Sequence, residues 1–495
     1  MAKSLQLTAA TLGSFFVIAF QLQLLPFFSP LFVDDRLFWP TIYYGTWSLV
    51  IGLTLVILAT QRPVLHRSLP VLVVCAFAAG LTLSHPIDSI SKNFLVATIF
   101  VACAAVLAIA SAPLALLRFS ASATVLTAVI CLLDILFVHG FTNTAGRAAG
   151  LSINANVAAA GLFLGAAGSF WTVPHRLRSP FLLIVGTAIF VTLSRSTLIA
   201  AVMICFGIAA DLLWTRIRSP RPHSRIRWLR SGALALALAG WIVVALFSND
   251  RFSVAARSAF LQIGTAPTEF AEAREAIAGA LSAKTPRSED IIKEIARRAE
   301  NEGDINSISA RGLLMERAYL SYQTGPFFGQ GLAAAHALQP HNTFLLFAIA
   351  FGDLGWIAPL AFLGLTVYSV RSIQQLPLFL ATLAVMATSH DILFTPGLLA
   401  PVIFGIAGLN ARRYHVDAPD AISAMRYAAV AAPIGFVIGA TSAIGIGPSS
   451  IAAAPQLLLL FVFCAITLWS VGVWRWHKKL VLQRKEASPR GPAWD

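Results

Sequence analysis

The sequence predicts an all-α polytopic membrane protein with about 12–14 transmembrane helices and one large helical loop outside the membrane. Three observations support this prediction. Hydrophobic residues make up 57% of the 495 residues, charged residues make up 12%, and the mean hydropathy is +0.76. These values are too apolar for a soluble domain. Apolar stretches of spanning length follow one another along the chain, and one long polar segment interrupts them.

The polar segment divides the chain into three parts. Residues 1–248 are expected to form N-terminal transmembrane helices, residues 249–341 a helical loop, and residues 342–495 further transmembrane helices with a tail. Apolar windows of about 17–25 residues mark about fourteen spans. They lie near 8–32, 40–60, 68–85, 93–116, 121–139, 155–172, 179–194, 196–214, 231–248, 342–370, 376–392, 397–410, 427–445 and 454–474.

Basic residues predict the orientation of the chain. The linker 215–230 contains Arg216, Arg218, Arg221, Arg225, Arg227 and Arg230 and no acidic residue, and the C-terminal tail is also basic. Short loops rich in Arg and Lys stay in the cytoplasm, which places both termini inside and the 249–341 loop outside. These loops account for most of the net charge of +14, so no nucleic-acid partner is expected.

The sequence gives no sign of a metal or cofactor site. All five cysteines fall inside apolar runs, without the spacing of a zinc site or a disulfide framework. We find no nucleotide-binding loop and no sequential hydrolase motif. We therefore expect no metal and no cofactor.

The outer loop is predicted to contain three helices, near 270–281, from Ser288 to about Gly303, and from about Ser309 to Thr324. The third is closed by Gly325-Pro326. On it, Arg311, Leu314, Met315, Ala318 and Tyr322 share one face, whereas Arg317 points nearly the opposite way. Arg311 is thus the arginine of this helix that we expect to face a site.

The loop ends in two short motifs, Gly329-Gln330-Gly331 and Pro340-His341-Asn342, and the chain then enters an apolar run with Gly352 and Gly355 at helical spacing. A histidine and an amide are thereby placed at the mouth of a membrane helix, below the extramembrane loop. This arrangement suggests a site at the boundary between water and lipid.

These residues carry a family resemblance. His341-Asn342, nine residues, Gly352, two residues and Gly355 resemble the H-N-x9-G-x-x-G signature of the O-antigen ligases, whose superfamily includes O-antigen polymerases and protein O-oligosaccharyltransferases. Three weaker elements in the same order are similar to that superfamily. They are Gly146-Arg147 through Asn154 and Asn156, Leu193-Ser194-Arg195-Ser196, and Arg311 through Gly331.

The resemblance implies a glycosyltransferase of the bacterial inner membrane with its active site facing the periplasm. Its donor would be a glycan linked to undecaprenyl diphosphate, and its acceptor a hydroxyl of lipid A–core or of another glycan. Developing charge on the diphosphate must be met by fixed donors, for which arginine is suited. The attacking hydroxyl needs a proton acceptor, a role that a histidine can fill.

Seven residues follow as candidates. We expect His341, Arg195 and Arg311 to be catalytic, and Arg147, Asn342, Asn156 and His390 to bind substrate. The three catalytic candidates also have structural alternatives. His341 could only cap a helix, Arg195 could snorkel to the membrane surface, and Arg311 could form an ion pair within the loop. Gly352 and Gly355 are expected to be packing notches between helices.

Three further functions stay open at this point. One is a polysaccharide polymerase of the same superfamily, although such enzymes often carry two large outer loops and this chain has one. Another is a protein O-oligosaccharyltransferase. A transporter of lipid-linked glycan belongs to a different class, which the single outer loop and the lack of an internal repeat disfavour.

Overall fold

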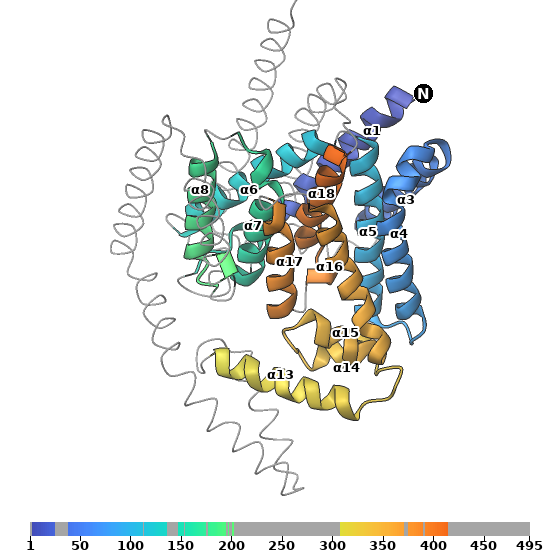
Figure 1. The fold of residues 1–495 in the computed structure, drawn as a ribbon, viewed down its shortest axis with the longest axis vertical. Helices are drawn as coiled ribbons and strands as arrows, with labels where there is room; N and C mark the ends of the chain where they lie inside the picture. Colours follow the sequence, from blue (N-terminus) through green and yellow to red (C-terminus); the bar gives the residue numbers. More distant parts are fainter. Residues whose placement is uncertain are drawn as a thin grey trace, which may run out of the picture.

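The computed structural model describes residues 2–24, 38–111, 113–135, 147–152, 154–174, 177–194, 197, 200–201, 307–370, 375–389 and 392–413. These residues are mostly helical, and no strand occurs among them (Figure 1). The predicted helical class is therefore confirmed. The predicted loop helices near 270–281 and 288–303 lie outside the described residues, as do several predicted spans, including 231–248, 427–445 and 454–474.

The N-terminal half of the described chain contains α1 (Ala2–Phe16), the π-helix η1 (Val17–Gln21), α3 (Phe38–Thr60), α4 (Arg62–Leu83), α5 (Ser89–Ala110), α6 (Pro113–Leu133), the 3-10 helix η4 (Gly150–Ser152), α7 (Ala155–Ser169), the 3-10 helix η5 (Phe170–Thr172) and α8 (Arg178–Val191). The second half contains α13 (Ser307–Thr324), α14 (Leu332–Ala337), α15 (Thr343–Phe351), the 3-10 helix η7 (Gly352–Trp356), α16 (Ile357–Ser369), α17 (Leu376–Thr388), the 3-10 helix η9 (Ile392–Phe394) and α18 (Pro396–Arg413).

Four helical stretches within the described residues are long and apolar enough to cross a membrane: Arg62–Leu83, Ser89–Ala110, Pro113–Leu133 and Thr343–Ser369. Shorter apolar helices accompany them, among them Pro180–Val191 and Pro396–Asn410. The chain thus has the apolar helices of a membrane protein. The total of about fourteen spans stays a prediction.

Three predicted spans run across a break in the observed helices. The span near 93–116 crosses the end of α5 at Ala110, after which α6 begins at Pro113. The span near 8–32 is interrupted, because η1 ends at Gln21 and Gln23 has a left-handed φ of 60°. The span near 342–370 is not one regular helix, because Gly352 has a φ of 64° and separates α15 from η7 and α16. Sequence hydropathy marks each of these regions as continuous, because every break lies within a longer apolar stretch.

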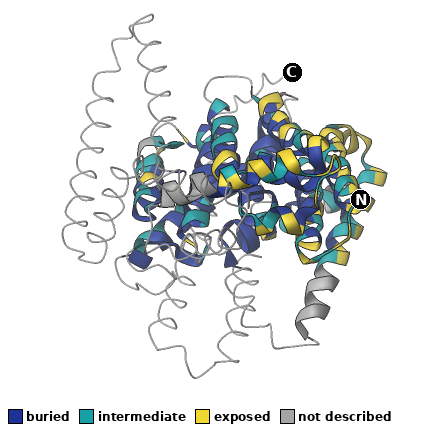
Figure 2. Cartoon of the chain, turned by 90° about the horizontal axis from the view of Figure 1, so that it is seen from below, coloured by how far each residue is buried: buried dark blue, intermediate teal, exposed yellow. Residues whose placement is uncertain are grey.

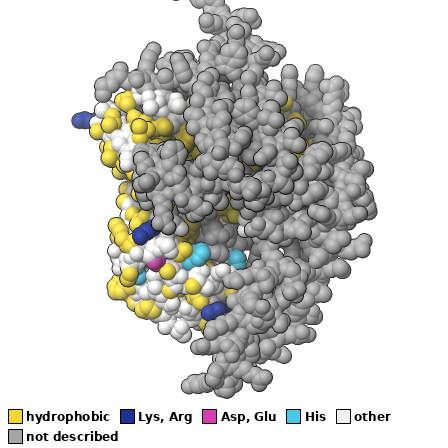
Figure 3. All heavy atoms as spheres, turned by 180° about the vertical axis from the view of Figure 1, so that it is seen from behind, with side chains coloured by type: hydrophobic (Ala, Val, Ile, Leu, Met, Phe, Trp, Pro, Cys, Tyr) yellow, Lys and Arg dark blue, Asp and Glu magenta, His cyan; other side chains and the backbone are white. Residues whose placement is uncertain are grey.

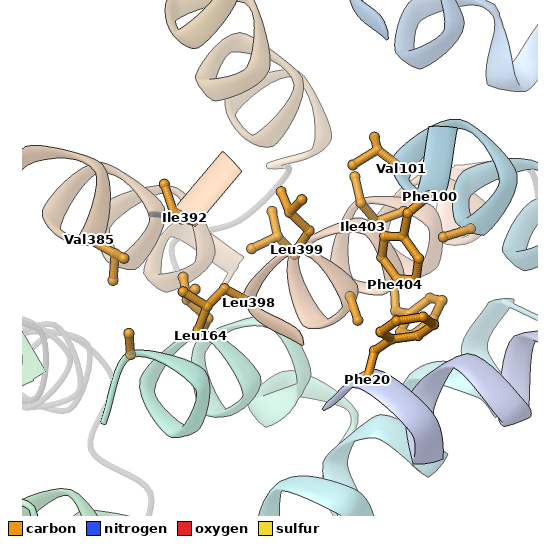
Figure 4. Close-up of a cluster of buried hydrophobic side chains, with 14 of the residues drawn as sticks. Phe20, Phe100, Val101, Leu164, Val385, Ile392, Leu398, Leu399, Ile403 and Phe404 are labelled. Carbon is orange, nitrogen blue, oxygen red and sulfur yellow. The ribbon is translucent and has the colours of Figure 1, made fainter. Parts of the chain in front are cut away.

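The centre of the bundle is formed by α18, which packs against α5, α6 and α7. Phe20, Phe100 and Phe404 come together there from η1, α5 and α18 (Figure 4). Glycines allow the helices to approach closely: Gly168 of α7 lies against Pro401 and Gly405 of α18, and Gly408 lies against Leu117 of α6. Burial is greatest in this central region, whereas exposed residues gather on the outer helices (Figure 2).

Several helix ends meet at one end of the bundle. The contacts of Gly161 with Leu398 and of Gly168 with Gly405 show that α7 and α18 run in the same direction. The N-termini of α7 and α18 therefore lie together with the C-terminus of α17. The contact between the rings of Phe94 and Phe394, 5.2 Å apart, adds the start of α5 to this group. We call it the α15 end, because α13, α14 and α15 lie against it (Figure 1).

Candidate functional site

His341 and Asn342 lie at the start of α15. The side-chain oxygen of Asn342 accepts a hydrogen bond from the Leu345 amide at 3.0 Å, which caps the helix. The Asn342 side-chain nitrogen donates to the Ala387 carbonyl at 3.3 Å, and the Thr343 hydroxyl donates to the Ser389 carbonyl at 2.6 Å. The start of α15 is therefore fixed to the end of α17.

Gly352 ends α15. Its φ of 64° and ψ of −148° belong to a region that is essentially restricted to glycine. A Cβ atom at this position would collide with the Phe327 carbonyl, and a Cβ at Gly355 would collide with the Phe347 carbonyl. Gly355 thus fits the expected packing notch between helices, because it lets η7 approach the backbone of α15. Gly352 differs from the expectation, because it ends α15 and lies against the backbone at Phe327.

The spacing of the sequence signature thus has a structural explanation. Asn342 is the residue before α15, Gly352 is the residue after it, and the nine residues between them are the nine residues of α15. A helix of nine residues is about 14 Å long, which is too short to cross a bilayer. All residues of α15 except the half-buried Phe344 are buried.

The C-terminus of α15 is capped by the Gly329-Gln330-Gly331 motif. The Gln330 amide donates to the Ile349 carbonyl and the Gly331 amide donates to the Ala350 carbonyl, both at 2.9 Å. The last carbonyls of a helix have no partner within the helix, so these bonds satisfy them. The φ values of Gly329 and Gly331, 80° and 87°, are ones that side chains rarely tolerate.

The backbone of His341 is left-handed. Its φ is 46°, and Gln339 has a similar φ of 45° on the other side of the buried Pro340. A non-glycine residue in this conformation costs of the order of 1–3 kcal/mol and persists only where its surroundings hold it. The half-buried His341 side chain is consequently presented at a defined position between α14 and α15.

A second part of the site is centred on Arg147, at the α15 end. Its Nε donates to the Thr192 carbonyl and its Nη2 donates to the side-chain oxygen of Asn156, both at 2.8 Å. The neighbouring Ala148 amide donates to the Val191 carbonyl at 3.1 Å. Arg147 and Ala148 thereby cap the C-terminus of α8, where a positive charge also complements the helix dipole.

Asp134 holds the segment that contains Arg147. One of its carboxylate oxygens accepts hydrogen bonds from the Ala149 amide at 3.1 Å and the Gly150 amide at 2.9 Å. The Asp134 side chain is only 2% exposed. Asp134 is not among the seven candidates. In the sequence it is a lone carboxylate within an apolar stretch, which is costly in a membrane unless it has partners.

The helix α13 is attached to η7 by a polar cluster. The Tyr322 hydroxyl donates to the Asp353 carboxylate at 2.6 Å and accepts from the Trp356 indole nitrogen at 3.3 Å. The hydrogen bond to Asp353 favours the protonated phenol and raises the pKa of Tyr322 above its ordinary value. The predicted helix from about Ser309 to Thr324 is confirmed as α13, with Leu314 and Ala318 buried, but Met315 is 45% exposed and does not share their inward face.

The seven candidate residues have different outcomes. Arg147 and Asn156 are hydrogen-bonded to one another, and His341 and Asn342 lie at the same end of the bundle. Arg311 belongs to α13, but its side chain lies outside the described residues, as do Arg195 and His390. Within the described part of the chain, no group of three or more His, Cys, Asp or Glu side chains is arranged to hold a metal ion.

Comparison with known proteins adds no assignment. No family model matches this chain, and no curated protein is significantly similar to it.

Proposed function

We propose that the protein is a glycosyltransferase of the bacterial inner membrane that resembles the O-antigen ligases. It would transfer a glycan from undecaprenyl diphosphate to a hydroxyl of lipid A–core at the periplasmic face. The observation that carries this proposal is the coincidence of the signature with one structural unit. His341-Asn342 begins α15, and Gly352 ends it after nine residues.

The chemistry assigns a role to each part of the site. The acceptor oxygen attacks the anomeric carbon of the donor sugar, and the bond from that carbon to the diphosphate oxygen breaks. A ring nitrogen of His341 takes the hydroxyl proton, while the leaving undecaprenyl diphosphate keeps the electron pair. Arginines compensate the charge on the leaving group.

The position of Arg147 supports this assignment. Its guanidinium plane is fixed by Thr192 and Asn156, so it need not be reordered when charge develops. Arg195 and Arg311 would complete the diphosphate site, as the family resemblance implies. Asn342 would bind sugar or orient His341, and His390 would line the acceptor groove.

The test is the glycan profile of a strain that lacks the protein, measured together with its extracted undecaprenyl-linked lipids. The proposal predicts bare lipid A–core and an accumulation of long lipid-linked polymer. Core capped by a single repeat unit, without long polymer, would indicate a polymerase instead. Unchanged lipopolysaccharide would overturn the proposed acceptor, and a purified protein that only moves intact lipid-linked glycan would be a transporter.

A further inference from the structure

The outer surface of α16 has the character of a lipid-facing helix. Ile357, Leu360 and Val367 are 45%, 53% and 49% exposed and occupy one side of the helix. They lie on α16 (Ile357–Ser369), which forms the second part of the apolar stretch Thr343–Ser369 after the break at Gly352. The adjacent helix α4 exposes further apolar residues, including Leu69 and Val73. Figure 3 shows hydrophobic side chains along the side of the molecule where α3 and α4 lie.

An exposed aromatic pair lies directly beside the start of this surface. Phe327 and Phe328 are each 66% exposed, and their ring centroids are 5.1 Å apart in an edge-to-face arrangement. The Phe327 carbonyl lies against Gly352, only five residues before Ile357. Leu354, which lies between Gly352 and Ile357 in the chain, is also 41% exposed. Exposed apolar residues therefore follow the chain from the segment beside Phe327 into α16.

The chemistry of this surface identifies what covers it. Two large side chains exposed to this extent on one turn are unfavourable in water and mark an interaction surface. Phe side chains on the apolar face of an interfacial segment insert at the boundary between headgroups and acyl chains, and this pair lies beside the exposed apolar side of α16. The side-chain amide of Gln330, in the same turn, forms a hydrogen bond within the protein: it donates to the Ser321 carbonyl at 3.2 Å.

We propose that Phe327 and Phe328 insert into the boundary between phospholipid headgroups and acyl chains at the α15 end. The pair is coupled to α13 through Gln330 and through Tyr322, which is bonded to Asp353. Insertion of the pair therefore sets the height of α13 relative to the membrane surface. This inference does not depend on the proposed transferase activity.

The experiment uses the full-length protein in phospholipid vesicles, with Phe328 replaced by the photoreactive analogue p-benzoylphenylalanine. This analogue keeps the phenyl ring, and gel filtration checks that each variant is folded. The same replacement at Gln323, an exposed polar position of α13, is the matched control, and Leu360 of α16 is the lipid-facing reference. After irradiation, mass spectrometry identifies the adducts.

The proposal predicts phospholipid adducts at position 328 at a level close to that at position 360 and several-fold above that at position 323. The same replacement at Phe327 should give the same pattern of phospholipid adducts, so the result does not depend on the orientation of one side chain. The proposal is overturned if positions 327 and 328 give no more lipid adduct than position 323. Adducts to a second copy of the chain, or to another segment of the same chain, would also overturn it.

Discussion

Two helices at the α15 end have their C-termini capped by segments distant in sequence, but by different means. The end of α8 is capped by the Ala148 amide together with the charged side chain of Arg147. The end of α15 is capped by two backbone amides, at Gln330 and Gly331, without a side chain. The cap of α8 places a guanidinium at a fixed position. The cap of α15 uses glycines that let the 329–331 segment approach the helix backbone closely.

The difference between the two caps suggests that the two regions have different roles. Around Arg147, polar side chains determine the local structure, so under the proposed function a substitution there should change the chemistry of the site as well as its shape. Around α15, the glycines Gly329, Gly331 and Gly352 determine the structure, and they contribute no functional group. Substitutions of the glycines around α15 should therefore mainly lower stability, whereas substitutions around Arg147 should mainly lower activity.

The largest effect is expected from Gly352→Ala. The new Cβ would meet the Phe327 carbonyl, and the backbone conformation is essentially restricted to glycine, so the variant should lose about 3 kcal/mol or more of stability. The loss is measured as a lower melting temperature of the purified protein in detergent. Gly364→Ala is the matched control, because nothing lies within 4 Å of a Cβ at that helical position. Equal melting temperatures of the two variants would contradict the role given to Gly352.

Arg147 is expected to show the opposite behaviour, with a loss of activity that exceeds the loss of stability. Arg147→Lys keeps a positive charge near the end of α8 but cannot reproduce the two bonds to Thr192 and Asn156. Transfer should fall by about 10²–10³-fold, measured with lipid-linked donor in vesicles. Arg317→Lys, on the exposed side of α13, should leave the rate unchanged. A fully active Arg147→Lys protein would assign Arg147 to capping alone.

Asn342→Ala should cost about 1 kcal/mol, because the cap of α15 is lost. Asn342→Asp keeps an acceptor for the Leu345 amide but lacks the donor to the Ala387 carbonyl. Its melting temperature should therefore lie between those of the alanine variant and the parent protein. If both variants melt like the parent protein, the link between α15 and α17 contributes no stability.

The smallest effect is expected from Tyr322→Phe, which removes the exposed hydrogen bond to Asp353 and should cost about 0.5 kcal/mol. Because the pKa of Tyr322 is raised in the folded protein, this contribution is present in full below the unfolded pKa, ordinarily 10.0. It is lost as the pH rises through the folded pKa. The difference in melting temperature between Tyr322→Phe and the parent protein should thus be constant near neutral pH and shrink in strong alkali. A difference that grew with pH would be inconsistent with Tyr322 as the donor.

The contrast also explains how much could be predicted from the sequence. Apolar helices such as α3, α7 and α18 are recognisable because burial in lipid or in the core requires long hydrophobic runs. The start of α15 is recognisable from an Asn before an apolar run. The break at Gly352 was missed because the glycine lies within an apolar stretch, and hydropathy carries no information on φ.

The contacts around the candidate residues could be predicted only in part, for a related reason. The proximity of Arg147 and Asn156 follows from a loop that precedes a helix, so it could be anticipated locally. The support from Thr192 and Asp134 depends on how α6, α7 and α8 pack, which no local pattern records. The left-handed backbone of His341 likewise arises from the connection between α14 and α15.

The central claim is that the His341 side chain acts in glycosyl transfer, and one paired measurement tests it most directly. Asn tolerates a left-handed backbone, so His341→Asn should keep the fold while removing the proton acceptor, and Gln339→Asn is the control with nearly the same φ. The account predicts a loss of about 10²-fold or more in transfer from undecaprenyl-diphosphate-linked glycan for His341→Asn, and a normal rate for Gln339→Asn. A His341→Asn protein that transfers glycan at the normal rate would contradict the account.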